Sequence, residues 1–252
     1  MLFRSGILSS PYETIHGILR GTAERISARA GTNQKERTLP LNRKSFAPGA
    51  VLAPIPVVMV SCGTESQHNI ITIAWTGIVN SNPPMTYISV RKERYSHRMI
   101  LERGNFVINL VNEELVRAAD WCGVKSGRDI DKFEAMNLHP VPSEKITAPG
   151  IAESPFSLEC TVDRVIELNS HDMILARIVR MSAAECFVDT TGRIRLDRMK
   201  LVAYNHGEYV GLNAHGLGQY GESVIKPSTR KKKNAIWRQK QRMRKKTKKQ
   251  GR

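Results

Sequence analysis

The chain has 252 residues, 40% hydrophobic and 25% charged, which suits one good-sized folded domain or two small ones. No window approaches the roughly 18 uninterrupted apolar residues of a membrane helix, so the composition predicts a soluble, cytoplasmic protein with no membrane partner. The formal net charge of +16 suggests a nucleic-acid partner, but 14 of the Lys and Arg residues lie in 226–252. Residues 45–225 hold 17 basic residues against 20 acidic ones, so by charge this part is not a nucleic-acid-binding domain.

The two ends of the chain differ in composition from the part between them. Residues 1–44 are rich in Arg, Ser, Thr and Gly, and we predict a disordered N-terminal extension there. A mitochondrial targeting segment is the alternative, although Glu13, Glu24 and Glu36 count against it. Residues 216–252 end in a block of like charge that repels itself, which predicts a disordered basic tail.

From residue 48 onward the sequence takes on the pattern of short strands. A Val-rich run that begins at Pro54 and Pro56 and ends at Gly63 predicts a strand. NIITIAWTG follows as a second predicted strand. NSNPP predicts a turn, and MTYISVRK predicts another strand. Ser96 stands at a predicted helix start, and Gly104 is the stop signal for that helix.

Strands also dominate the second half of the predicted domain. NFVINLV is β-rich, and Asn112 opens a second short helix that Gly123 ends. After a loop region with a helical turn near Lys132, two β-branched runs joined by NSH predict a hairpin, and KLVAYNHGEYVGL closes the domain. Many short strands with two small helices and no β-α-β alternation predict a mainly β fold, a closed barrel with a few short helices, over 45–215.

The four cysteines do not form a recognisable metal site. Cys62, Cys122, Cys160 and Cys186 are far apart, with no CxxC pair and no His cluster to complete a zinc set. We therefore predict no metal and reduced, mostly buried thiols, with a disulfide framework as the alternative.

Two segments have the residue types that a phosphorylated cofactor needs. In NIITIAWTG, Thr72, Ala74 and Thr76 are small side chains around an aromatic wall, Trp75, although a half-buried strand core would have the same pattern. In ISVRKERYSH, cations surround a helix start at Ser96, where orphan N–H groups and the helix dipole both favour an anion. A solvated basic strand end is the alternative for this second segment.

Eight segments in order resemble the flavin reductase-like family, specifically its flavoredoxin branch, which has the FMN-binding split-barrel fold. They are PIPVVMVSC, NIITIAWTG, PPMTYISVRKERYSH, FVINL, DWCGVKSGRDIDKF, SPFSLECTV, SHDMILARIV and YNHGEYVGL. The resemblance implies a homodimer that binds FMN near the subunit interface, with NADH or NADPH as a possible co-substrate. The positions that match the family's FMN-binding motifs are Asn69, Thr72, Ala74, Trp75, Thr76, Ser89, Arg91, Arg94, Ser96, His97, Asn109, Lys132, His171 and Tyr204.

The resemblance also implies particular roles for some of these residues. Ser96 meets the phosphate, helped by Arg91 and Arg94, while Asn69 and Trp75 lie beside the flavin. Lys132 is a cationic contact, where a lone surface lysine is the alternative. His171 is the candidate for a catalytic role near the flavin or nicotinamide, where a solvated turn histidine is the alternative. Tyr204 stands where the family often has Phe, which adds a hydroxyl to the site.

Three functional hypotheses follow. The first is an NAD(P)H-dependent flavin reductase or related oxidoreductase, in which the isoalloxazine supplies the chemistry and no acid–base dyad is required. The second is a flavoredoxin-like electron carrier that a redox-protein partner reduces. The third belongs to a different class: non-specific nucleic-acid binding through the basic segment 226–252.

Overall fold

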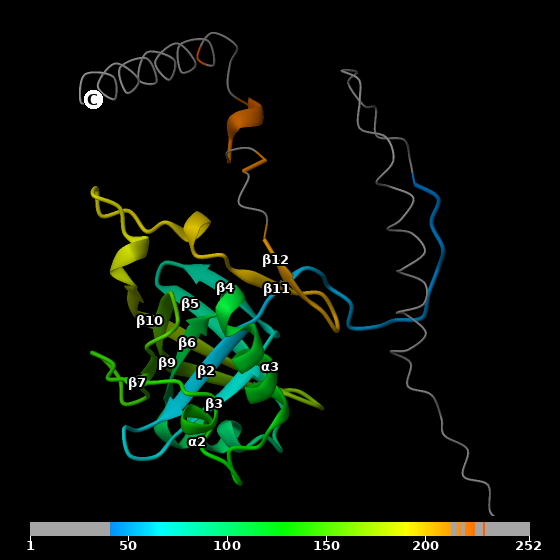
Figure 1. The fold of residues 1–252 in the computed structure, drawn as a ribbon. Helices are drawn as coiled ribbons and strands as arrows, with labels where there is room; N and C mark the ends of the chain where they lie inside the picture. The colour runs from blue at the N-terminus through cyan, green and yellow to red at the C-terminus, as the bar shows by residue number, and fades with distance from the viewer. Residues whose placement is uncertain (1–40, 213–215, 218–219, 225–228, 230–252) are drawn as a thin grey trace, which may run out of the picture. The chain divides into compact units, whose positions relative to one another are not determined.

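The structure is a computed structural model that describes residues 41–212, 216–217, 220–224 and 229 (Figure 1). The chain divides into two units, 1–49 and 50–252, and the described part of the first, 41–49, is exposed and without regular secondary structure. Most of 1–44 and 216–252, including the predicted nucleic-acid-binding segment, lies outside the described residues. Within the described ranges, no helix has both the length and the apolar character needed to cross a bilayer.

Strands make up most of the described domain. They are β1 (Ile55–Pro56), β2 (Val58–Gly63), β3 (His68–Ile73), β4 (Thr76–Ser81), β5 (Pro84–Val90), β6 (Asn105–Leu110), β7 (Pro140–Val141), β8 (Gly150–Ile151), β9 (Phe156–Glu167), β10 (Asp172–Ala183), β11 (Val202–Tyr204) and β12 (Tyr209–Gly211). The helices are α2 (Tyr95–Arg103), α3 (Val116–Val124) and α4 (Lys132–Ala135), with short 3₁₀ turns η1 (Glu113–Leu115), η2 (Glu185–Phe187), η3 (Leu196–Arg198) and η4 (Glu222–Val224).

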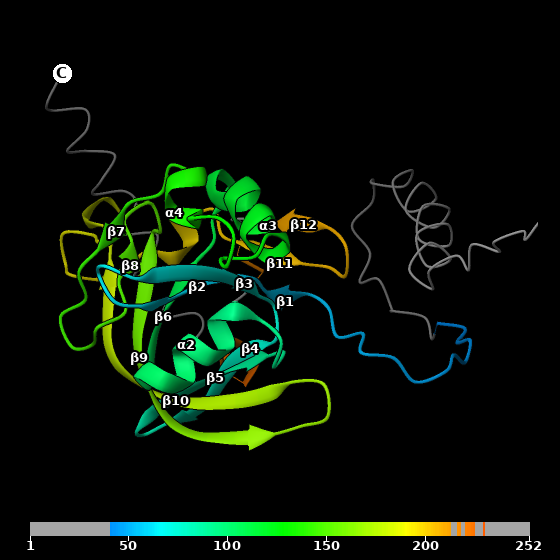
Figure 2. The same ribbon diagram turned by 90° about the horizontal axis from the view of Figure 1, so that it is seen from below.

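Seven strands form one antiparallel sheet in the order β3-β2-β6-β9-β10-β5-β4. The edge strands β3 and β4 are consecutive in the sequence, and only Ala74 and Trp75 join them. Two residues can connect opposite edges only if the sheet curls round, so the strands form a barrel that is split between β3 and β4. Helix α2 lies across one end of this barrel, and α3 lies beside β3 (Figure 2). The predicted mainly β fold with a few short helices is therefore confirmed.

The core consists of two clusters, one on each face of β2. The alternating side chains of this strand send Val58 and Val60 into the barrel interior, where α2 adds Met99 and Ile100. Met59 points to the opposite face and belongs to the cluster that holds the buried residues of α3. Helices α2 and α3 are therefore fixed on opposite sides of β2 and β3, and this arrangement positions the residues at the start of β3.

The predicted elements differ from the observed ones at two informative places. NIITIAWTG was predicted as one strand but is divided between β3 and β4. The prediction missed the turn at Ala74 and Trp75 because that turn contains neither glycine nor proline. Helix α2 begins at Tyr95, one residue before the predicted capping serine. Arg94 has the extended backbone of an N-cap, and its carbonyl accepts a hydrogen bond from the His97 N–H at 3.0 Å. The predicted stop is confirmed, since Gly104 has a left-handed φ of 66°.

Candidate functional site

The start of β3, the start of α2 and the end of α3 enclose a cavity of about 260 Å³, here called the Ser96 pocket. Its lining combines basic, hydroxyl and small residues: Asn69, Ile71, Glu93, Arg94, Tyr95, Ser96, Cys122, Gly123, Lys125, Ser126, Gly127 and Lys132. Glu93, the acidic residue in this lining, pairs with Arg91 at 3.4 Å. The pocket therefore has an excess of positive charge and suits an anionic ligand.

The first turn of α2 contributes hydrogen-bond donors to this pocket. Its N-cap, Arg94, makes no side-chain capping hydrogen bond, and the first turn has no acidic residue. The N–H groups of Tyr95 and Ser96 have no partner within the helix, because a helix leaves its first N–H groups unpaired. Together with the positive end of the helix dipole, they form the usual anion-binding arrangement of a helix N-terminus.

Asn69 holds the Ser96 hydroxyl in a fixed orientation. The Asn69 Nδ2 amide donates to Ser96 Oγ at 2.8 Å, and both side chains are buried. Because Ser96 Oγ accepts this bond, its own hydrogen can be donated elsewhere, either to the neighbouring Cys62 sulfur or to a ligand. Gly127 permits the arrangement, since a Cβ at that position would lie 2.1 Å from Asn69 Oδ1. The residue pair and the glycine thus form one wall of the pocket.

Lys132 is a buried cation, only 4% exposed, at the start of α4. Its Nζ donates to the carbonyls of Ile70 and Cys122, both at 2.7 Å, which connects β3 to α3. An ammonium has three hydrogens, so one remains for a ligand in the pocket. Burial lowers the pKa of Lys132 to about 8 from its ordinary value of 10.5. The alternative of a surface lysine is therefore wrong for this residue.

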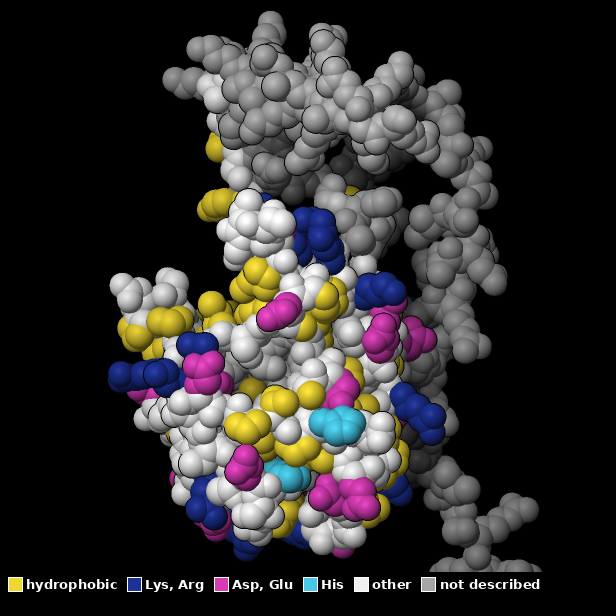
Figure 3. Space-filling model, turned by 60° about the vertical axis from the view of Figure 1, so that its left-hand side comes forward, with side chains coloured by type: hydrophobic (Ala, Val, Ile, Leu, Met, Phe, Trp, Pro, Cys, Tyr) yellow, Lys and Arg dark blue, Asp and Glu magenta, His cyan; other side chains and the backbone are white. Residues whose placement is uncertain are grey.

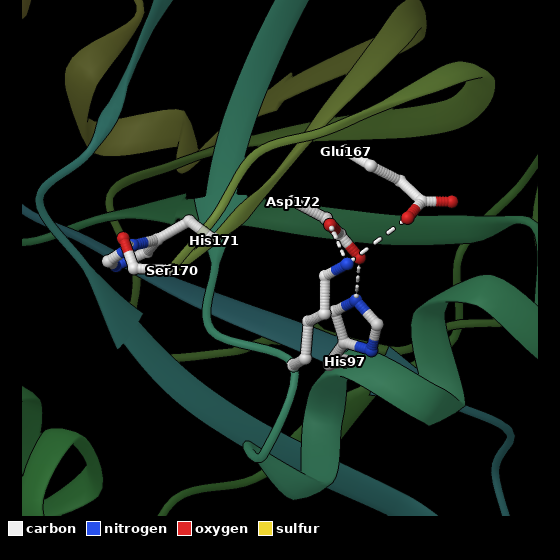
Figure 4. A network of polar contacts seen from close by, with 6 residues as sticks. His97, Glu167, Ser170, His171 and Asp172 are labelled. Atoms are coloured by element: carbon white, nitrogen blue, oxygen red, sulfur yellow. Dashed lines mark hydrogen bonds and ion pairs between the residues drawn. The ribbon is translucent and has the colours of Figure 1, made fainter.

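His97 turns away from the Ser96 pocket and pairs with Asp172 (Figure 4). Its Nε2 lies 2.7 Å from Asp172 Oδ2, while Lys92 Nζ lies 3.3 Å from the other carboxylate oxygen and 3.2 Å from Glu167 Oε2. Burial acts to raise the pKa of Asp172, but the hydrogen bonds from His97 and Lys92 outweigh it and hold that pKa below its ordinary value. This network joins the first turn of α2 to the β9–β10 hairpin.

His171 precedes Asp172 and, in Figure 4, lies on the other side of the hairpin from His97, with Ser170 beside it. Its Nδ1 is 2.9 Å from Ser170 Oγ. Partial burial, together with the charge of Arg91, lowers the pKa of His171 below its ordinary value. His171 does not belong to the lining of the Ser96 pocket.

A second group of predicted residues lies at the far end of β3. Trp75 is 40% exposed, and its ring centroid is 6.2 Å from that of His206 in an edge-on arrangement. The Tyr204 ring lies 6.1 Å from His206 and 5.6 Å from Tyr209. His206 Nε2 donates to the carbonyl of Leu52 at 2.9 Å, which holds the ring in place. These aromatic side chains form a partly exposed cluster, here called the Trp75 cluster.

The remaining predicted residues make contacts within the protein. The Thr72 hydroxyl donates to the carbonyl of Ala119, and the Thr76 hydroxyl donates to that of Tyr87 at 2.6 Å. Ala74 lies in the turn beside Trp75, and the backbone of Ser89 donates to the Trp75 carbonyl at 2.9 Å. Asn109 is fully buried, and its side chain forms hydrogen bonds with residues of β2, β6, β8 and β9. Arg91 is exposed beside Glu93.

Of the predicted site residues, Asn69, Arg94, Ser96 and Lys132 therefore meet in one pocket, and Trp75 and Tyr204 meet in a cluster. The sequence did not predict His206 as a site residue, nor any residue of the segment 125–128 that faces the start of α2. The signal for that segment was available, because KSGR combines two cations with a hydroxyl and a glycine. The signal for His206 was weaker: an Asn-His-Gly turn.

The four cysteines are all reduced, and one of them, Cys122, lines the Ser96 pocket. Cys62, Cys122 and Cys160 are buried, Cys186 is exposed, and all four are free, as predicted. Burial raises the pKa of the Cys62 and Cys160 thiols to about 12 and that of Cys122 to about 11, so these thiols stay protonated. The described residues include no group of three or more His, Cys, Asp or Glu that could hold a metal ion.

A split β-barrel with a cationic pocket at a helix N-terminus defines a class of protein that is equipped to hold an anionic ligand such as a phosphorylated cofactor. The chain belongs to the flavin reductase-like family: the family model described as "Flavin reductase like domain" matches residues 52–212. The predicted family and its flavoredoxin branch are therefore confirmed, and so is the split-barrel fold.

Two solved structures and one curated relative illustrate this membership. The flavoredoxin of Desulfovibrio vulgaris (Miyazaki F) is 29% identical with a TM-score of 0.68, and the match covers 73% of this chain and 100% of that one. The flavoredoxin of Methanosarcina acetivorans is 25% identical with a TM-score of 0.65, and the same shares are covered. An NADH-dependent FAD reductase of Streptomyces globisporus is 25% identical over 146 residues, 56% of this chain and 79% of the relative.

Proposed function

We propose that the chain binds FMN with its phosphate in the Ser96 pocket and acts as an oxidoreductase that takes hydride from NADH or NADPH. The observation that carries this proposal is the set of donors that converge on one cavity: the first N–H groups of α2, the oriented Ser96 hydroxyl, and the cations Arg94 and Lys132. This set fits the phosphate of FMN, which has about −1.5 to −2 charges at pH 7 and three acceptor oxygens.

The rest of the flavin extends along β3 in this proposal. Asn69 lies at the phosphate end of that strand, and Trp75 lies two residues beyond its last residue, roughly 20 Å further along an extended chain at about 3.3 Å per residue. The half-exposed Trp75 and its neighbour Tyr204 then offer aromatic surface to the ring system. Bound FMN supplies hydride and electron chemistry, and the residues of this chain bind and orient it.

The electron donor is tested by mixing the purified full-length protein, loaded with FMN, with NADH and with NADPH under anaerobic conditions. We expect the visible flavin absorbance to bleach with at least one of the two nicotinamides. This expectation is supported by the similarity to a relative named NADH-dependent FAD reductase. If bound FMN stays oxidised with both donors but bleaches with dithionite, the reductase proposal fails and the electron-carrier hypothesis replaces it.

We also propose that the chain is a homodimer. Exposed apolar side chains on strands β4 and β10 support this, with Ile78 67% and Met181 57% exposed. Figure 3 shows one face of the molecule, on which hydrophobic side chains lie among acidic and basic ones.

Sedimentation velocity tests the dimer. We expect the wild-type protein to sediment with the mass of two 28.3-kDa chains, and the double variant Ile78→Asp, Met181→Asp to shift to the mass of one. Val124→Asp is the matched control, because Val124 is 71% exposed but lies on α3. A wild-type protein that is monomeric at micromolar concentration would contradict the proposal.

A further inference from the structure

Asp172 is a buried carboxylate that contacts two residues of one short segment. It is the first residue of β10, and the sheet fixes its position, because it pairs with Val90 at the end of β5. Its side chain is 5% exposed. Asp172 Oδ2 lies 2.7 Å from His97 Nε2, and Oδ1 lies 3.3 Å from Lys92 Nζ (Figure 4). One carboxylate therefore holds the segment 92–97 at both of its ends.

The segment held in this way contains the groups that a phosphate requires. Between its two ends lie Arg94, Tyr95 and Ser96, and all three line the Ser96 pocket. The N–H groups of Tyr95 and Ser96 are the unpaired donors at the start of α2. In the described structure, neither His97 nor Asp172 lines this pocket. Asp172 therefore contacts the residues that flank the phosphate donors and leaves the pocket itself open.

Few local interactions stabilise the start of α2. A helix start is commonly stabilised by a capping side chain or by an acidic residue in the first turn. The N-cap of α2, Arg94, makes no side-chain capping hydrogen bond, and the first turn contains no acidic residue. A carboxylate in that turn would repel a bound phosphate, because both groups are anions. Asp172 provides a carboxylate from outside the pocket instead, with its charge paired to His97 and Lys92.

We propose that Asp172 is a positioning residue for the phosphate of FMN. By holding both ends of the segment 92–97, it keeps the N–H groups and the hydroxyl at the start of α2 in the geometry that the phosphate requires. Asn69 holds the same turn at Ser96 from β3, so two separate strands fix it. This inference rests on the proposed function, because it takes the phosphate to lie in the Ser96 pocket.

Riboflavin provides the test, because it is FMN without the phosphate. The dissociation constants of both flavins are measured by fluorescence titration for the full-length wild type and for Asp172→Asn. An asparagine has one acceptor oxygen, so it can accept from Lys92 or from His97 but not from both through separate oxygens. We expect the variant to bind FMN about 10- to 100-fold more weakly and riboflavin within about twofold of wild type.

Asp163→Asn is the matched control. It makes the same substitution on β9 of the same hairpin, where the partners of the carboxylate are Arg164 and Arg177, at 3.4 and 2.9 Å. Both partners belong to that hairpin, so the start of α2 stays in place and neither constant should change by more than about twofold.

Two variants of His97 test the same contact from the helix side. His97→Gln keeps an N–H donor for Asp172, whereas His97→Leu removes it. We expect His97→Leu to lose FMN affinity as Asp172→Asn does, and His97→Gln to bind FMN at least about fivefold more tightly than His97→Leu. Riboflavin affinity close to that of wild type shows that each variant is folded.

The outcomes separate this inference from the proposed function. Unchanged FMN affinity in Asp172→Asn would overturn the positioning role. An equal loss of affinity for FMN and riboflavin would also overturn it, because it would show a general weakening of the fold. Both results leave the proposed function intact if the wild type binds FMN more tightly than riboflavin. A wild type that binds FMN no more tightly than riboflavin, or binds neither, would overturn the proposed function and this inference together.

Discussion

Replacing Gly127 with alanine should weaken FMN binding by roughly 10- to 150-fold while the protein stays folded. The added Cβ would lie 2.1 Å from Asn69 Oδ1, so the Asn69 side chain has to move. We expect that movement to break the 2.8 Å hydrogen bond to Ser96, so that the hydroxyl loses its fixed orientation. Titration of FMN against the variant, followed by flavin fluorescence, measures the loss.

Gly123→Ala is the matched control for this substitution. It adds the same methyl group to another glycine of the pocket lining, but there the new Cβ meets the Thr72 side chain at 3.2 Å and leaves Asn69 untouched. We expect its FMN affinity to remain within about threefold of wild type, since small shifts relieve such a contact. Equal FMN affinity in Gly127→Ala and wild type would show that the Asn69–Ser96 pair is not part of the phosphate site.

The affinity for FMN should fall as the pH rises above about 8. Burial lowers the pKa of Lys132 to about 8, so its ammonium is charged below that pH and neutral above it. The FMN phosphate is a dianion throughout this range, and it loses the attraction of the cation as Lys132 deprotonates. Because the bound phosphate raises the pKa of Lys132, the dissociation constant should increase by up to tenfold per pH unit above pH 8. Titrations between pH 6.5 and 9.5 measure this slope.

The variant Lys132→Met tests whether Lys132 is the group whose deprotonation weakens FMN binding above pH 8. This variant should bind FMN about 10- to 100-fold more weakly at pH 7 and show no rise in the dissociation constant between pH 8 and 9. In the absence of FMN, the lowered pKa of Lys132 affects the stability of the fold, and it makes the folded protein more stable as the pH rises. Between pH 8 and about 10.5 the unfolded chain keeps a proton on Lys132 that the folded chain has lost, so the free energy of unfolding rises with pH. A pH slope that persists in Lys132→Met would show that another group titrates.

Much of the fold was predictable because local signals agreed with the tertiary structure. Gly104 ends α2 and Asn112 caps the turn that leads into α3, as the sequence predicted, and the hairpin of β9 and β10 forms around the predicted NSH turn. The break at Ala74 and Trp75 was not predictable from local pattern. The apolar alternation continues through it, and the turn exists because the sheet has to close on itself.

The candidate site was predictable in part, because its residue types were visible but their orientations were not. The anion-binding start of α2 followed from Ser96 and its neighbouring cations. Lys132 was selected from the sequence and lines the pocket, yet its burial and its two carbonyl partners depend on how α4 packs against β3. His97 is next to Ser96 in the sequence but points toward Asp172, because adjacent helical residues point about 100° apart.

A crystal structure of the full-length protein with FMN tests the central claim most directly. We expect the phosphate in the Ser96 pocket, with its oxygens within hydrogen-bond distance of Ser96 Oγ and of the first N–H groups of α2, and with Lys132 Nζ beside it. FMN bound with its phosphate away from the start of α2, or no FMN bound at millimolar concentration, would show that this pocket is not the phosphate site.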